Sequence, residues 1–285
     1  MKKTVRQILS AVLVFGMLLA LVSCGNSDKQ TKEPQQTESK STTTTTQPTV
    51  KAQVPNTVKE FDKCSWAEFA AILRDGYNVG TAWYVNDDRW FATGAFKTIK
   101  LSNGEEIEIR ILDFEHDVKP DGTKAKVTLG VTALYFENEK MNSAKTNAGN
   151  WTDSDMRKYL NDETAGIYSM LPNDLKQLIT PVVKKTESEN NAEEFVSSTD
   201  KLFLFSKMEM NGSVWNDVFG DTGYQYSYFF WRNVAMKTKQ DEYGSWWLRS
   251  PDPDNKEKFY CIDETGEMRT AEADAAKGIV FGFCV

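Results

Sequence analysis

The sequence has a single histidine, His116, among its 285 residues. This scarcity excludes metal motifs that need two imidazoles, and it makes any Ser-His or Cys-His catalytic pair depend on one residue. Cysteines are also few, four in all, and no Cys-x-x-Cys or Cys/His group has the spacing of a metal site. Charged and turn-forming residues surround His116, so we expect it to lie on the surface in a solvated loop.

Positive charge is in deficit. The formal net charge of the chain is −7, and residues 1–23 carry three positive and no negative side chains, so subtracting +3 leaves −10 for the remainder. An acidic chain is repelled by nucleic acid and by anionic lipid headgroups. We therefore expect no nucleic-acid partner.

No apolar run reaches the roughly 20 residues that a membrane-spanning helix needs. The longest, Ile8 to Val22, follows Lys2, Lys3 and Arg6 and ends in the residues Leu-Val-Ser-Cys24-Gly. This order resembles the signal segment of bacterial lipoproteins. The resemblance implies that residues 1–23 are removed, that Cys24 is acylated, and that the rest is anchored to a bacterial membrane outside the cytoplasm. An ordinary cleaved signal and an uncleaved anchor are the alternatives.

The stretch 24–55 is almost free of large apolar side chains and is rich in Ser, Thr and Gln. Such a composition does not bury enough apolar area to offset the entropy lost on ordering, so we expect a disordered tether. Residues 56–285 are long enough for one sizeable domain, and they show no internal repeat and no second linker. The sequence thus predicts one globular head on a tether.

Helical and strand patterns are segregated in this head rather than alternating, which favours an α+β fold with a mainly antiparallel sheet. A capping box, Ser65-Trp-Ala-Glu68, predicts the first helix, and Ser102-Asn103-Gly104 predicts a tight hairpin. Further helices are expected over 152–162 and from Pro172 to Pro181. Strands are expected over 81–85, 90–93, 96–101, 106–114, 126–136, 201–206, 246–250, 259–263 and 278–285.

Three motifs follow one another along the head: WTDSDMRKYLN (Trp151 to Asn161), DKLFLFS (Asp200 to Ser206) and SWWLRSP (Ser245 to Pro251). Together they resemble a family of bacterial extracytoplasmic domains of unknown function, marked by a [YW]WLRSP strand. The resemblance covers roughly residues 79–285 and implies a C-type-lectin-like architecture. Family members close with a G-V-R-P-A-like strand, whereas Gly278 to Cys284 lacks the Arg and the Pro, so no residue of this strand corresponds to that arginine.

Arg249 is the one charged residue in the strand 246–250. In an extended strand, Trp247 and Arg249 share one face and Trp246 the other, so one of the two faces should be core. We expect Arg249 to pair with a buried carboxylate, with Asp155 or Asp162 as candidates. The alternative is that Trp247 and Arg249 bind a ligand.

Aromatic residues are dense between Tyr224 and Trp231. If the segment is extended, Tyr224, Tyr226 and Tyr228 fall on one side, followed by Trp231. Phenol rings with a polar tip suit a surface that stacks on sugars or on peptide side chains, and core packing explains them equally well. We take Tyr224, Tyr226, Tyr228 and Trp231 as candidate ligand-binding residues within the region 207–258.

The loop after the signature strand, Asp252-Pro-Asp254-Asn, is rich in oxygen. Asp252 and Asp254 are candidate ligand-binding residues and weak candidates for calcium, whereas the simpler interpretation is a Pro/Asp turn. No metal or other cofactor is expected.

Three cysteines, Cys64, Cys261 and Cys284, remain once Cys24 is assigned to lipid. Outside the cytoplasm, one disulfide with one leftover thiol is the simplest count, and Cys284 could close onto Cys261 or onto Cys64. In an anaerobic setting all three would stay reduced as small buried hydrophobes.

These observations favour a lipid-anchored, extracytoplasmic head that binds a glycan or a surface protein without catalysis, with the membrane as its other partner. Two alternatives stay open. One is an extracytoplasmic hydrolase that uses carboxylates such as Glu115 or Asp117, and the other is a purely structural envelope lipoprotein.

Overall fold

The computed structural model describes residues 60–75, 79–80, 91–191, 193–212, 224–230, 236–237 and 242–285, with only the backbone of 79–80 and 236–237. The expected signal segment and tether, Cys24 and Trp231 lie outside these residues. The described residues all belong to one compact unit, Thr49–Val285. No helix among them is long and apolar enough to cross a membrane.

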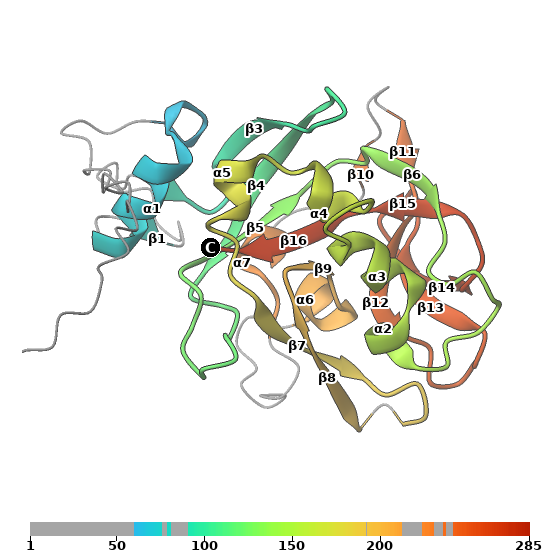
Figure 1. Ribbon diagram of the computed structural model, residues 1–285. Helices are drawn as coiled ribbons and strands as arrows, with labels where there is room; N and C mark the ends of the chain where they lie inside the picture. The colour runs from blue at the N-terminus through green and yellow to red at the C-terminus, as the bar shows by residue number, and fades with distance from the viewer. Residues whose placement is uncertain are drawn as a thin grey trace, which may run out of the picture. The chain divides into compact units, whose positions relative to one another are not determined.

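In the described part of the chain, most strands belong to two five-stranded sheets (Figure 1). The first has the order β3 (Phe96–Lys100), β4 (Glu106–Phe114), β5 (Val127–Val131), β16 (Phe281–Cys284) and β9 (Leu202–Leu204). The second has the order β14 (Met268–Glu272), β13 (Lys258–Ile262), β12 (Trp246–Pro251), β15 (Lys277–Ile279) and β6 (Phe136–Glu139). All neighbours are antiparallel except β12 and β15.

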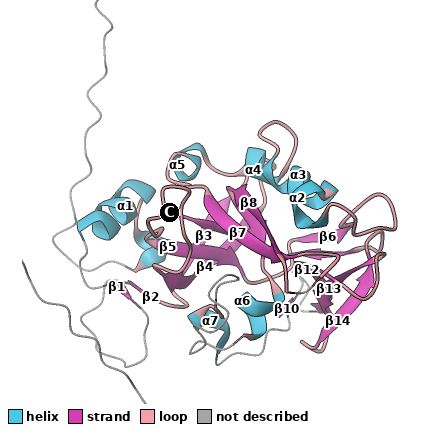
Figure 2. Ribbon diagram, turned by 90° about the horizontal axis from the view of Figure 1, so that it is seen from below, coloured by secondary structure: helices cyan, strands magenta, loops and turns pink. Residues whose placement is uncertain are grey.

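Smaller elements complete the described part. The paired strands are β7 (Val182–Glu187) with β8 (Phe195–Asp200), β1 (Val79–Gly80) with β2 (Phe91–Ala92), and β10 (Met236–Lys237) with β11 (Tyr243–Gly244). The helices are the 3-10 turn η1 (Phe61–Lys63), α1 (Trp66–Asp75), α2 (Asn150–Asp153), α3 (Asp155–Asn161), α4 (Ile167–Met170), α5 (Asn173–Lys176), α6 (Lys207–Asn211) and α7 (Ser227–Phe230). In Figure 2, α2 to α5 lie on one side of the strands, and α6 and α7 lie on the other. The predicted α+β class is confirmed, whereas the C-type-lectin likeness stays a prediction.

Local signals place the first elements as expected. The Glu68 amide donates to Ser65 Oγ (3.2 Å) and the Ser65 amide donates to Glu68 Oε2 (2.9 Å), which is the predicted capping box. The hairpin from β3 to β4 turns at Gly104, whose φ of +89° disfavours side chains. Strand β4 then alternates, and its isoleucines, for example Ile107 and Ile109, are fully buried.

The C-terminal strand is divided between the two sheets. A single strand over 278–285 was expected, but β15 ends at Ile279 and β16 begins at Phe281, with the buried Val280 between them. Because β15 pairs with β12 and β16 pairs with β5 and β9, this one segment joins both sheets into one core.

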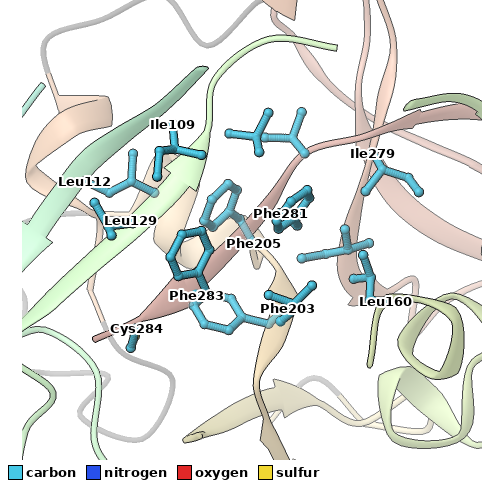
Figure 3. Packing of buried hydrophobic residues seen from close by; sticks show 14 of the residues in the cluster. Ile109, Leu112, Leu129, Leu160, Phe203, Phe205, Ile279, Phe281, Phe283 and Cys284 are labelled. Carbon is cyan, nitrogen blue, oxygen red and sulfur yellow. The ribbon is translucent and has the colours of Figure 1, made fainter. Parts of the chain in front are cut away.

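Phenylalanines pack around β16. Figure 3 shows Phe203, Phe205, Phe281 and Phe283 close to one another, and all four are buried. Gly282 of β16 lies against the rings of Phe203 and Phe205. A Cβ at this position would come within 2.8 Å of both rings. The lack of a side chain at Gly282 therefore lets β9 approach β16.

Both faces of β12 are buried, from Trp246 to Pro251. One face was expected to belong to the core, and in fact both do, because β12 is a central strand of its sheet and is covered on both sides. The Trp247 indole N–H donates to the Glu139 carbonyl (2.9 Å). The Trp247 side chain is therefore part of the core.

The expected helix over 152–162 is broken in two. Ser154 has extended backbone angles and separates α2 from α3, and it caps α3 by accepting from the Arg157 amide (3.1 Å). The helix expected from Pro172 to Pro181 is the short α5. The hairpin β7–β8 was not anticipated, because Val-Val-Lys-Lys-Thr-Glu gives only a weak alternation.

Candidate functional site

Four charged side chains meet inside the molecule. They come from four places: Asp117 after β4, Lys184 from β7, Glu209 from α6 and Arg249 from β12. Each side chain is at most 4% exposed. We call these four residues the buried charge cluster. Two cations and two carboxylates compensate one another, as buried charges require.

Arg249 and Glu209 form the first half of the cluster. Arg249 donates to Glu209 through two nitrogens, at 2.5 and 2.9 Å, in the bidentate geometry that suits guanidinium and carboxylate. It also donates to the Leu204 and Lys185 carbonyls (2.8 and 3.1 Å) and to Thr186 Oγ1 (3.1 Å). All three guanidinium nitrogens are therefore hydrogen-bonded.

The expected pairing of Arg249 with a buried carboxylate is confirmed, but both proposed partners are wrong. Asp155 is exposed and accepts from the Ser143 amide (2.8 Å). Asp162 is exposed and caps the following turn through Thr164 (2.7 Å). Both carboxylates accept from backbone amides at the surface, so neither reaches into the core.

Lys184 and Asp117 form the second half. Lys184 Nζ lies 2.5 Å from Asp117 Oδ1 and 2.6 Å from Glu209 Oε1, and therefore bridges the two carboxylates. The other oxygen, Asp117 Oδ2, accepts from Thr128 Oγ1 (2.6 Å) and from the Tyr226 hydroxyl (2.9 Å). The Asp117 carboxyl thus has an amine on one oxygen and two hydroxyls on the other.

His116 is buried beside this carboxylate, which overturns the expectation of a surface residue. Its Nε2 donates to the Tyr224 carbonyl (2.8 Å), and its Nδ1 lies 3.5 Å from Asp117 Oδ2. Its ring packs on Tyr224 and Tyr226, with centroids 4.2 and 4.1 Å away. The charged residues next to His116 suggested a solvated loop. One of them, Asp117, is instead buried because its partners Lys184 and Thr128 come from strands that are distant in sequence.

The electrostatics of the cluster follow from these contacts. Burial alone would raise the pKa of Asp117, but Lys184 and His116 outweigh it and hold the pKa well below its usual value. Burial is likewise outweighed at Glu209, where Arg249 and Lys184 lower the pKa to about 2. Burial works to lower the pKa of Lys184, yet Asp117 and Glu209 raise it. The resting cluster is ionic.

The two carboxylates considered for hydrolysis do not form an acid pair. Asp117 is buried and paired with Lys184, whereas Glu115 is exposed and pairs with Lys126 (2.8 Å). Glycoside hydrolysis needs two carboxyl groups that reach the same bond of a bound substrate. A salt-bridged interior carboxylate and an exposed one do not supply that arrangement.

A second polar network involves residues of the WTDSDMRKYLN motif. The Asp200 side chain is fully buried and accepts from Trp151 Nε1 (2.9 Å), Arg157 Nε (2.6 Å) and Ser198 Oγ (2.7 Å). The Asn161 side-chain oxygen accepts from the amides of Lys201 and Leu202 (3.1 and 2.9 Å). The first two motifs therefore fasten α2 and α3 to β8 and β9, which is a structural role.

The aromatic run does not form the extended face that was expected. Ser227–Phe230 is a helical turn, α7, whose first residue donates to Asp113 Oδ2 through its amide and hydroxyl (3.0 and 2.9 Å). Tyr226 is fully buried, and Tyr224 and Tyr228 are half-buried. With Trp247 and Arg249 also buried, three of the candidate ligand residues are interior.

Asp252 and Asp254 lie in a turn, as the simpler interpretation held. The Asp254 amide donates to Asp252 Oδ1 (3.0 Å). The buried Asn147 amide nitrogen donates to the carbonyls of Asp252, Asn255 and Lys258 (2.9, 3.0 and 3.0 Å) and holds the loop. Within the described ranges, no group of three or more His, Cys, Asp or Glu side chains is placed to hold a metal ion.

The three cysteines of the head are buried thiols rather than partners in a disulfide. Cys261 lies in β13 and Cys284 in β16, which belong to different sheets, and this separation explains why they are not joined. The disulfide expectation is wrong, and the alternative of buried small hydrophobes holds. Cys284 Sγ lies 3.4 Å from Thr128 Oγ1 and 3.5 Å from Asp117 Oδ2.

An open hollow of about 300 Å³ lies on the surface beside α3. Its lining combines a tyrosine ring with amide, hydroxyl, ammonium and carboxylate groups. The lining residues are Asn138, Glu139, Lys140, Ser143, Asp155, Met156 and Tyr159. Ser143 donates to Asp155 Oδ2 through its amide and hydroxyl (2.8 and 2.7 Å), so the loop is fixed to α3.

Sequence reasoning missed Lys184, Glu209 and Thr128. Glu209 carried a signal, since Ser206-Lys-Met-Glu209 is a capping box, and the structure has both of its bonds (2.9 and 3.1 Å). Lys184 is one of two adjacent lysines, and the sequence does not indicate which of the two is buried. The hollow was not anticipated either, because its two sides are brought together only by the fold.

A comparison with known protein families identifies this chain's family. A family model described as a domain of unknown function (DUF6273) matches residues 125–285, which are 161 of the 285 residues. The match includes Thr128, Lys184, Glu209 and Arg249 and begins after Asp117. No curated protein and no solved structure matches the chain. The chain belongs to the DUF6273 family of domains of unknown function.

Proposed function

We propose that the protein is a bacterial lipoprotein, anchored through acylated Cys24 and facing outside the cytoplasm, whose head binds a hydroxyl-rich ligand such as a surface glycan. The anchor is supported by Lys2, Lys3 and Arg6, the apolar run and the Leu-Val-Ser-Cys24 sequence. The polar stretch 24–55 would serve as a tether that gives the head reach above the lipid surface. Acylation by several chains gives stable attachment.

The proposal that the head binds a glycan rests on the hollow beside α3. Sugar recognition uses an aromatic ring for stacking and fixed amide, hydroxyl and carboxylate groups for hydrogen bonds, and this lining offers that set. Its volume of about 300 Å³ suits one or two sugar units. Contact without turnover is favoured because two buried carboxylates of the head, Asp117 and Glu209, are engaged in salt bridges.

The test is a glycan array probed with the full-length Cys24→Ala chain. We expect binding to a subset of glycans, and we expect Tyr159→Ala to weaken it at least tenfold because the ring that stacks is lost. Tyr243→Ala is the matched control, since Tyr243 is 54% exposed and does not line the hollow. Equal melting temperatures of the two variants would show that folding is not the cause.

Three outcomes separate the functions. Binding that depends on Tyr159 supports the proposal. Turnover of chromogenic glycoside or peptide substrates would instead establish the hydrolase alternative. No binding and no turnover would refute the proposed activity and favour an envelope protein whose head packs against its neighbours.

A further inference from the structure

Lys184 and Asp117 are placed to react with each other. Nζ and Oδ1 are 2.5 Å apart, and Glu209 Oε1 lies 2.6 Å from the same nitrogen. The Lys184 side chain is 1% exposed and that of Asp117 4%. An amine, a carboxyl and a second carboxylate thus meet where bulk water is excluded. We propose that Lys184 and Asp117 condense into an intramolecular amide bond, with Glu209 transferring the proton.

The two oxygens of Asp117 have the different surroundings that this reaction needs. Oδ2 accepts from Thr128 Oγ1 (2.6 Å) and the Tyr226 hydroxyl (2.9 Å), so negative charge that develops there during addition is stabilised by two donors already in place. Oδ1 faces Lys184 and is the oxygen that leaves. Fixed neighbours at contact distance replace a bimolecular encounter by a unimolecular step.

The step balances without an oxidant or a reductant. The Nζ–Cγ bond forms and the Cγ–Oδ1 bond breaks. Of the three ammonium protons, one stays on the amide nitrogen, one passes directly to Oδ1, and one reaches Oδ1 by way of Glu209 Oε1. The oxygen departs with both protons as one water molecule.

The surroundings suit the product as well as the reactants. Condensation removes one cation and one carboxylate and leaves the bidentate Arg249–Glu209 pair, so the remaining charge is still compensated. The new carbonyl, Oδ2, keeps its two hydroxyl donors, and the amide N–H faces Glu209 Oε1. No polar atom of the new bond is left without a partner.

The ionic resting state of the cluster limits the rate of condensation. Burial lowers the pKa of Lys184, but its two carboxylates outweigh burial and raise it, so the free amine is a minor form. The centroid of the Phe203 ring lies 3.8 Å from Lys184 Nζ, and this ring also favours the charged ammonium form of Lys184. The reaction is therefore slow and depends on the lasting contact that the folded core provides. The bond would tie β7 to the end of β4, 67 residues apart in sequence.

The test is mass spectrometry of the purified full-length protein after reduction, denaturation, alkylation and digestion. We expect a branched peptide that joins the Lys184 and Asp117 segments and is lighter than their sum by one water, about 18 Da. Lys184→Met should lose the branched peptide. Lys185→Met, the matched control on the neighbouring residue, should keep it, and Glu209→Gln should reduce its yield at least tenfold.

Other outcomes overturn the inference. Linear peptides with unmodified Lys184 and Asp117 as the whole population would refute it directly, even if every variant misfolds. A loss of water that survives Lys184→Met would point instead to cyclisation at Asp121-Gly122. A branch that hydroxylamine cleaves would be a thioester of Cys284, whose sulfur lies 3.5 Å from Asp117 Oδ2.

Discussion

Removal of Arg249 tests whether the buried charge cluster holds the head together. In Arg249→Leu with Lys184 unreacted, Glu209 keeps only Lys184 as a cation, and three acceptors lose the arginine as their donor: the Leu204 and Lys185 carbonyls and Thr186 Oγ1. Breaking a buried ion pair from one side costs about 3–5 kcal/mol. For a domain of this size, about 2–4 °C per kcal/mol gives a melting temperature lower by about 6–20 °C.

The assay is urea unfolding at pH 7 followed by tryptophan fluorescence, with thermal melts in parallel. Arg269→Leu is the control, because Arg269 is 60% exposed and its pairs with Asp263 and Glu267 lie on the surface. We expect that control to change the free energy of unfolding by less than about 1 kcal/mol.

A double variant separates charge from shape. In Arg249→Leu/Glu209→Met both members of the pair are gone, while Lys184 and Asp117 still compensate each other. We therefore expect the double variant to lose less stability than the sum of the single ones. A loss below about 1 kcal/mol in Arg249→Leu, or strict additivity in the double variant, would refute the reasoning.

Three further predictions concern Glu209, Gly282 and Asp200. The pKa of Glu209 is about 2 in the folded state and 4.5 in the unfolded state, so its contribution to stability is complete above pH 4.5 and fades towards pH 2. Urea midpoints should therefore fall in that pH window, and Glu209→Gln should flatten the fall. An equal slope in both proteins would contradict this. Gly282→Ala should destabilise by about 1–3 kcal/mol by crowding Phe203 and Phe205, and a melting temperature equal to that of the wild type would argue against the close approach of β9 and β16. Asp200→Ala should lower the free energy of unfolding in urea by about 2–4 kcal/mol, because Trp151, Arg157 and Ser198 lose their acceptor. Asp254→Ala, at an exposed position, should change it by no more than about 0.5 kcal/mol. Similar losses in the two variants would contradict the network.

Local signals in the sequence predicted what depends on neighbours along the chain. The capping box at Ser65 and the Ser-Asn-Gly104 turn formed where expected, because a few adjacent residues determine them. The α+β class also followed from segregated patterns. Ser154 shows the limit: the same serine that caps α3 breaks the longer helix that the periodicity had suggested.

The interior polar groups were the harder part. Arg249 was expected to find a buried acid, yet Glu209 lies 40 residues away on a helix that also uses it as a cap. His116 and Asp117 stand among charged residues, and the sequence gives no sign that Lys184 approaches from another strand. Burial of such charges depends on pairing across the fold, and a single sequence does not reveal which distant residues meet.

The central proposal is that acyl chains on Cys24 fix this protein to a membrane. Metabolic labelling with palmitate and fractionation of wild type and Cys24→Ala, expressed in a bacterium that processes lipoproteins, test it most directly. We expect label and protein together in the membrane fraction for the wild type, and unlabelled protein in the soluble fraction for Cys24→Ala. An unlabelled wild type, or a Cys24→Ala chain that stays with the membrane, would contradict the account.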